Sequence, residues 1–110
     1  MIEQTVKVTK LYDGYKGLLT ARQQRCFELH YFQDLSFAEI GADMGVTRQA
    51  ANDIVQRAVE QMQVVEDRVG FLKMQGVFVT GLRRIQQDLQ AGSYEDALAV
   101  TDNLLKNEES

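Results

Sequence analysis

A short polar stretch near the middle of the chain has the residue types that read DNA bases. Residues 47–57 are TRQAANDIVQR, and a helix that begins there turns its polar side chains outward if Ala51 and Ile54 face the core. Arginine hydrogen-bonds guanine edges, and asparagine and glutamine hydrogen-bond adenine edges. We expect the outward residues to lie in a DNA major groove; they are Thr47, Arg48, Gln49, Asn52 and Gln56. Thr47 and the free N–H groups of the helix start are expected to hold a phosphate.

The residues just before this stretch match the requirements of a helix-turn-helix, which we place at residues 36–58. Gly41 is the small residue expected where the two helices touch, and Gly45 supplies the positive φ that the turn needs. Ser36 and Glu39 have the spacing of a capping box for the first helix of the motif. Thr47 follows the turn as an N-cap for the second helix.

The charges leave a second interpretation open. The chain carries a net charge of −4, with +3 in residues 1–25 and −7 in residues 26–110. DNA affinity depends on neutralising phosphates, so this balance argues mildly against a nucleic-acid partner. An exposed polar helix start is also typical of a solvated surface, and helix-turn-helix units also serve as protein-binding platforms. A protein-interaction module therefore stands beside the DNA-binding hypothesis.

The elements that position the motif are predicted to be helices throughout. The chain has no proline, and apolar residues recur at helical spacing, which indicates an all-α protein. We expect helices at 3–18, 21–32, 37–45 and 47–70, with Thr20 and Gln23 as a capping box before the second. A buried face is expected on the long recognition helix at Ala51, Ile54, Ala58, Met62 and Val65.

The domain organisation follows from these helices. Residues 1–70 are predicted to form the helix-turn-helix domain. Residues 71–110 are predicted to form a C-terminal helical extension that packs on this domain or on a partner subunit. Three glycines and the segment VFV weaken the helix pattern after residue 70, because glycine costs about 1 kcal/mol relative to alanine in a helix interior.

Little in the sequence suggests an enzyme, a metal site or a cofactor site. Cys26 is the one cysteine and His30 the one histidine, and both are expected to be structural. A lone cysteine fits the reducing cytoplasm. No apolar run approaches the ~18 residues of a membrane span, so no membrane insertion is expected.

The segment LLTARQQRCFELHYFQDLSFAEIGADMGVTRQAANDIVQRA, residues 18–58, resembles region 4 of sigma factors, which reads the −35 promoter element. Residues 1–72 more broadly resemble the YlxM family of small, all-helical bacterial helix-turn-helix proteins. Genes of that family commonly neighbour those of the signal recognition particle GTPase and its receptor. The sequence departs from the usual pattern at Gly41, where alanine is usual and glycine loosens the helix, and at Ala51, where a bulkier residue is common. Asn52 and the residues after it also differ, so no base preference is transferred.

The resemblance implies two hypotheses of function. The first is a DNA-binding regulatory protein that takes part in the signal recognition particle pathway and acts as a cytoplasmic homodimer, because a free domain with few charges needs a second copy for useful affinity. The second is a module that binds no DNA and modulates the signal recognition particle GTPase or its receptor.

Overall fold

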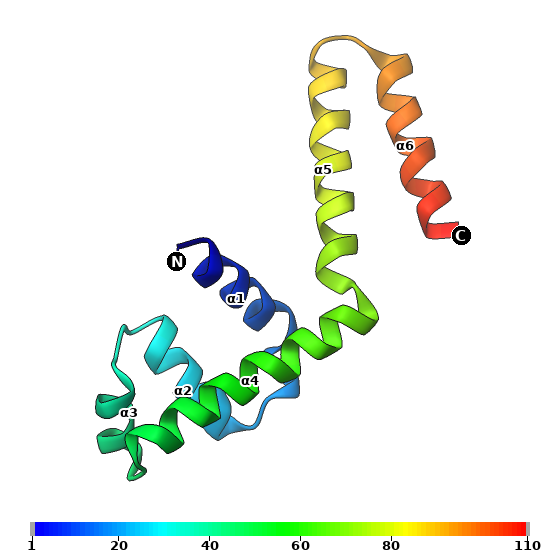
Figure 1. Cartoon of the computed structure of the whole chain (residues 1–110). Coiled ribbons are helices and arrows are strands. Elements are labelled where there is room, and N and C mark those ends of the chain that lie inside the picture. The colour runs from blue at the N-terminus through cyan, green and yellow to red at the C-terminus, as the bar shows by residue number, and fades with distance from the viewer. Residues whose placement is uncertain (1, 110) are drawn as a thin grey trace. The chain divides into compact units, whose positions relative to one another are not determined.

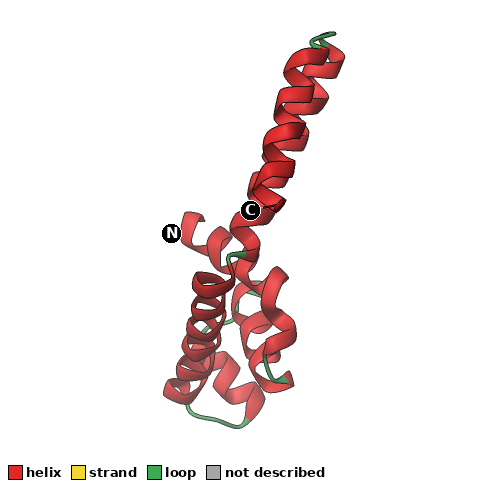
Figure 2. Cartoon of the chain, turned by 90° about the vertical axis from the view of Figure 1, so that its right-hand side faces the viewer, coloured by secondary structure: helices red, strands yellow, loops and turns green. Residues whose placement is uncertain are grey.

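The computed structural model describes residues 2–109, and side chains over residues 3–106. Within that part the chain is all-helical, as predicted, and has no strand (Figures 1 and 2). The elements are α1 (Ile2–Tyr15), the short 3₁₀ helix η1 (Lys16–Leu18), α2 (Ala21–Tyr31), α3 (Phe37–Met44), α4 (Arg48–Val69), α5 (Phe71–Gln90) and α6 (Tyr94–Glu109). The described chain divides into two compact units, residues 2–70 and 71–109. We call them the N-terminal unit and the C-terminal hairpin.

The predicted helix starts of the N-terminal unit are confirmed in detail. Thr20 and Gln23 form a reciprocal capping box before α2, and the Thr20 hydroxyl accepts from the Gln23 N–H at 3.1 Å. The predicted first helix ends earlier than expected, at Tyr15, and η1 completes it. α4 runs for 22 residues and ends at Gly70, whose φ of 66° stops the helix.

α4 is the central element of the N-terminal unit, since α1, α2 and α3 all pack against it. Its fully buried residues follow a four–three–four spacing: Ala51, Val55, Ala58 and Met62. The prediction of Ile54 and Val65 as core residues was wrong in part, because both are only half-buried. Because three helices pack around α4, Val55 lies in the middle of the buried face of α4 and Ile54 lies at the edge of that face.

An aromatic layer closes the core between α1 and α2. The rings of Tyr12 and Phe27 stack with centroids 4.2 Å apart, and Phe27 is fully buried. The Tyr12 hydroxyl donates to the Glu28 carboxylate, and the Tyr15 hydroxyl donates to Glu66 of α4 at 2.6 Å. These bonds tie α1 to both α2 and α4.

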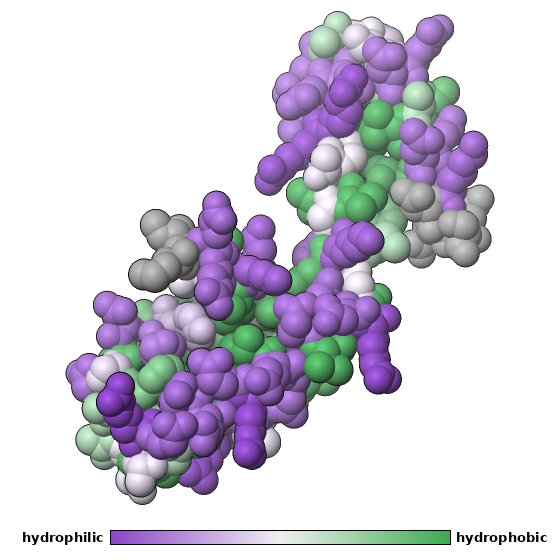
Figure 3. All heavy atoms as spheres, in the orientation of Figure 1, coloured by the Kyte–Doolittle hydropathy of each residue, from purple (hydrophilic) through white to green (hydrophobic). Residues whose placement is uncertain are grey.

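α5 continues unbroken through the glycines that weakened its prediction, and it pairs with α6. Figure 3 shows hydrophobic side chains along the line where α5 and α6 meet. A Cβ on Gly81 would lie 2.8 Å from the methyl carbons of Leu104, so this glycine allows the two helices to approach closely. An alanine at this position would require the Leu104 side chain to move.

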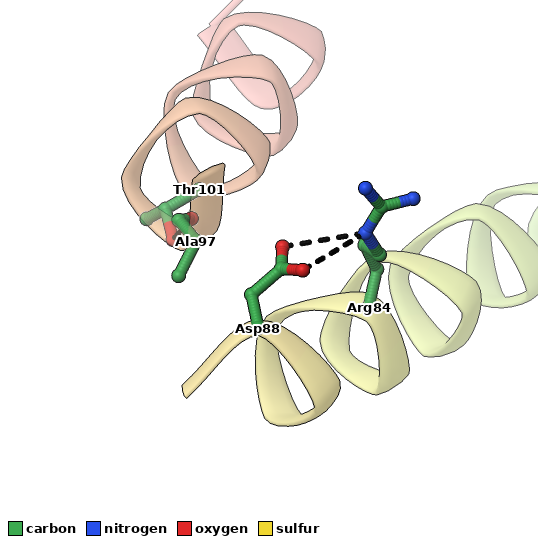
Figure 4. Close-up of polar contacts among 4 residues, drawn as sticks. All are labelled: Arg84, Asp88, Ala97 and Thr101. Atoms are coloured by element: carbon green, nitrogen blue, oxygen red, sulfur yellow. Dashed lines mark hydrogen bonds and ion pairs between the residues drawn. The ribbon is translucent and has the colours of Figure 1, made fainter. Parts of the chain in front are cut away.

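One buried carboxylate sits at the closed end of the hairpin. The Arg84 Nε–H donates to both oxygens of Asp88, at 3.1 and 3.3 Å (Figure 4). The Asp88 carbonyl also accepts from the Ser93 N–H at 2.7 Å, across the turn in which Gly92 has φ 75°.

Among the described residues, no helix is long and apolar enough to cross a membrane.

Candidate nucleic-acid interface

The turn between α3 and α4 has the geometry that its glycines dictate. Gly45 adopts φ 71° and ψ 31°, a left-handed conformation that costs glycine little. The N–H groups of Gly45 and Val46 both donate to the Gly41 carbonyl, the latter at 2.9 Å. These bonds end α3, and α4 begins after three intervening residues.

Gly41 lies where α3 meets the start of α4. A Cβ at this position would stand 2.7 Å from the Val46 carbonyl oxygen, and 3.1 and 3.2 Å from backbone atoms of Thr47 and Arg48. These neighbours are backbone and cannot rotate away. The absence of a side chain therefore brings the two helices together more closely than alanine would allow.

Both helices of the motif start at capped residues. The Ser36 hydroxyl accepts from the Glu39 N–H at 3.2 Å, and the Glu39 carboxylate accepts from the Ser36 N–H at 3.0 Å. The second of these bonds lowers the pKa of Glu39, since it favours the ionised form. The Thr47 hydroxyl accepts from the Ala50 N–H at 3.0 Å, which fixes the direction of α4.

The predicted base-reading residues lie together on the N-cap and the first three turns of α4. Thr47, Arg48, Gln49 and Gln56 are exposed, and Asn52 is half-buried. Two of their amides are already engaged along the helix: Gln49 donates to Asp53 at 3.0 Å, and Gln56 donates to Asn52 at 3.4 Å. These surface bonds orient the amides and exchange readily for bonds to another polar partner.

The charges around this face are partly cancelled by neighbours. Arg25 of α2 pairs with Asp43 of α3 at 2.9 Å, so that acid is neutralised. Arg48 and Arg57 form no ion pair within residues 3–106, and residues 47–57 carry a net charge of +1. Sequence reasoning missed the Arg25–Asp43 pair, since its members lie 18 positions apart on different helices. The face is weakly basic.

A small apolar core supports the motif from behind. Cys26, Leu29, Ile40, Ala51 and Val55 form its buried centre. The Cys26 sulfur lies 3.1 Å from the Met44 sulfur, one residue before the turn glycine. Burial raises the pKa of the Cys26 thiol.

His30 belongs to the same support. Its ring stacks on Phe37 with centroids 4.3 Å apart, and its Nδ1 lies 3.0 Å from the Leu35 carbonyl oxygen. Both contacts hold the loop that leads into α3. Within the described residues, no group of three His, Cys, Asp or Glu side chains is placed to hold a metal ion.

Comparison with known proteins identifies relatives of this chain. The sequence profile of the family described as "UPF0122: Putative helix-turn-helix protein, YlxM / p13 like" matches residues 2–102. A UPF0122 protein of Geobacillus kaustophilus is 36% identical over 73 residues, which are 66% of this chain and 66% of the relative. A UPF0122 protein of a Thermoanaerobacter species is 31% identical over 83 residues, 76% of this chain and 71% of the relative.

A UPF0122 protein of Desulforamulus reducens is 42% identical over 66 residues, 60% of this chain and 56% of the relative. The alignments thus cover just under two-thirds of the Geobacillus protein and a smaller share of the Desulforamulus protein. No solved structure matches the chain.

Proposed function

The chain belongs to the UPF0122 family of YlxM/p13-like helix-turn-helix proteins, and from this premise we propose that it is a cytoplasmic DNA-binding regulatory protein. Its reading element is the start of α4, entered into a major groove as recognition helices are. The observation that carries the proposal is the exposure of Thr47, Arg48, Gln49 and Gln56 on a helix start that a capped turn holds rigidly.

Each residue of this face has a distinct proposed role. Arg48 reads a guanine or holds a phosphate, since its guanidinium forms no ion pair within residues 3–106. Gln49, Asn52 and Gln56 offer amides to base edges. The Thr47 hydroxyl accepts the cap bond and still has its own hydrogen to donate to a phosphate.

The weak charge of the face implies that one copy binds DNA weakly. A net charge of +1 over residues 47–57 neutralises few phosphates. We therefore propose that the protein acts as a homodimer and binds two half-sites, with recognition helices about 34 Å apart or a multiple of that distance.

A DNA-library selection with the purified chain tests this function, followed by anisotropy titrations of the selected duplex at several salt concentrations. Arg48→Ala should weaken binding about tenfold or more, in line with ~1–3 kcal/mol for a base contact. Arg68→Ala is the matched control, because Arg68 is exposed in the last turn of the same helix. Its effect should stay within about twofold. Selection of no preferred sequence, or equal losses in the two variants, would contradict the proposal.

A second candidate function is supported by the distribution of charge. Residues 26–110 carry −7, and this acidic balance suits a basic protein partner. The resemblance to YlxM proteins points to the signal recognition particle GTPase or its receptor as that partner, which would place the chain in the signal recognition particle pathway. A hollow of about 780 Å³ lined in part by Leu18, Val64 and Val65 offers apolar surface away from the start of α4.

The second candidate is tested with the purified GTPase and its receptor. Co-sedimentation at low salt and the rate of GTP hydrolysis are measured with and without the chain. Binding that persists in Arg48→Ala supports this function separately from DNA recognition, and the absence of association at low salt would remove it.

A further inference from the structure

The C-terminal hairpin leaves most of its large apolar side chains in contact with solvent. Within residues 71–106 the buried residues are Ala97, 5% exposed, and Asp88, 8% exposed. Segments of about 40 residues rarely bury enough surface to be stable alone and commonly gain stability by oligomerisation. The hairpin therefore lacks a core of its own.

Five exposed apolar residues of the hairpin lie on one face of it. Leu82 of α5 and Leu98 of α6 are 60% and 62% exposed, and Leu89, Tyr94 and Leu105 are also at least half exposed. At about 100° per residue, the two α5 positions lie about 80–100° around the helix from Gly81, and the three α6 positions lie about 60–120° around the helix from Ala97 and Leu104, which mark the line of contact. Because α5 and α6 are antiparallel, the exposed apolar residues of both helices lie on the same side of the hairpin. We call this set of five residues the apolar face.

We propose that a second copy of the chain covers the apolar face, so that two hairpins form a four-helix bundle around a two-fold axis. This inference builds on the homodimer of the proposed function and names its interface. α5 has 20 residues, so two adjacent helices give a face about 30 Å long and about 20 Å wide. The buried area is then about 1,200 Å² in total, the lower end of the range for stable interfaces.

The charges of α5 and α6 are complementary. This favours a second copy of the chain as the partner that covers the apolar face, and it also indicates how the two copies are oriented. α5 carries Lys73, Arg83 and Arg84 against Asp88, for a net charge of +2. The residues of α6 carry a net charge of −4. A two-fold axis along the bundle sets each α5 against the partner's α6, so opposite charges meet. A two-fold axis perpendicular to the bundle sets each α5 against the partner's α5 and each α6 against the partner's α6. Like charges then meet, so this orientation is disfavoured.

The same arrangement predicts a specific ion pair. Gly81 lies opposite Leu104 within one hairpin, so Arg83 is level with position 102. A two-fold axis along the bundle keeps this level and brings Arg83 beside Asp102 of the partner subunit, on the outer edge of the interface. Arg83 and Asp102 are exposed and form no ion pair within residues 3–106. Each is thus available to a second copy.

The interface is tested first by removing its apolar contacts in the full chain. Sedimentation equilibrium gives the dimer dissociation constant of the wild type, Leu82→Lys and Leu98→Lys without DNA. Each substitution occurs twice in the dimer, so we expect the dissociation constant to rise about 100-fold or more. Val64→Lys is the control, since Val64 is 54% exposed on α4, and it should leave the constant unchanged. Far-ultraviolet circular dichroism checks that every variant stays helical.

The orientation is tested by exchanging the charges of the predicted pair. Arg83→Glu and Asp102→Arg should each weaken the dimer about tenfold or more, and the double variant should restore most of the wild-type affinity. These are surface positions, so the test does not depend on a variant that disturbs packing. Arg57→Glu in the N-terminal unit is the charge-matched control.

Several outcomes would overturn the inference. A wild type that is monomeric at about 100 μM, loss of the dimer in Val64→Lys but not in Leu98→Lys, or a double charge exchange weaker than either single variant would each do so. A normal dimer that selects no DNA would contradict the DNA-binding proposal alone. A monomer that binds DNA would contradict this interface and the proposed homodimer, but not the proposed reading face at the start of α4.

Discussion

Gly41 offers the sharpest test of the turn, because two effects of opposite sign act on one methyl group. Gly41→Ala removes the flexibility of glycine inside α3, which favours the helix by about 1 kcal/mol. The new Cβ also meets three backbone atoms of the turn, the nearest being the Val46 carbonyl oxygen at 2.7 Å. We expect the second effect to win.

The size of the loss follows from what must move. The turn backbone has to shift by about 0.5 Å or more, and overpacking of this kind costs about 1–3 kcal/mol. The shift also disturbs the 2.9 Å bond from the Val46 N–H to the Gly41 carbonyl and the Thr47 cap beside it. After the propensity gain of about 1 kcal/mol is subtracted from this cost, we expect Gly41→Ala to lower the free energy of unfolding of the N-terminal unit by up to about 2 kcal/mol. Each kcal/mol corresponds to about 4–8 °C in the thermal midpoint.

Near-ultraviolet circular dichroism follows this unit selectively during urea unfolding, since Tyr12 and Tyr15 are buried there and Tyr94 of the hairpin is exposed. Gly76→Ala is the control for propensity, and far-ultraviolet circular dichroism follows its unfolding. Gly76 lies inside α5 with nothing within 4 Å of its added Cβ, so that variant should stabilise the hairpin by about 0.5–1 kcal/mol. If Gly41→Ala is as stabilising as Gly76→Ala, the close approach does not constrain residue 41 and the reasoning fails.

Three further predictions concern capping and ionisation. Thr47→Ala should lower the free energy of unfolding by about 1 kcal/mol and Thr47→Ser by much less, because only alanine removes the cap acceptor; equal losses in urea titrations would contradict the cap. Hydrogen bonding from Ser36 lowers the pKa of Glu39 below 4.5, so its stabilisation is present above about pH 4.5 and is lost as the pH falls through the lowered pKa. The Glu39→Gln variant should lack this loss of stability at acid pH. If the wild type and the variant have identical thermal midpoints from pH 6 to 3, the prediction is wrong. Burial, and next the bond to Glu28, raises the pKa of Tyr12 above its ordinary value of 10.0, so its stabilisation is lost as the pH rises above about 10. Tyr12→Phe should reduce this alkaline loss and cost about 1–2 kcal/mol at pH 7, as thermal melts across the pH range would show.

Local signals account for what the sequence predicted of the fold. A hydroxyl residue three positions before an acid or amide marks a helix start, as Thr20 and Ser36 do, because the two side chains satisfy each other's backbone groups. Glycine at a helix end marks a left-handed residue, as Gly45 and Gly70 do. These features depend on neighbours in the chain and need no knowledge of packing.

Features that depend on packing were harder to predict. Ile54 and Val55 are adjacent and both apolar, so the helical period alone does not decide which one the surrounding helices bury. The glycines of α5 weakened the prediction of a helix there, yet the helix is unbroken and Gly81 lies against Leu104 of α6. The candidate DNA-reading residues were placed on one helix start from spacing alone, whereas the bonds Gln49–Asp53 and Gln56–Asn52 appear only once side chains are seen.

The sulfur contact behind the turn gives the N-terminal unit a built-in reporter. Cys26 is the only cysteine of the chain and is wholly enclosed next to Met44. An alkylating reagent reaches it only when the core formed by α2, α3 and α4 opens, so the rate of labelling under native conditions measures how often this region opens. A DNA duplex or a protein partner that binds the N-terminal unit and stabilises its closed state should slow the labelling of Cys26. Binding can thus be detected without attaching a dye to the protein.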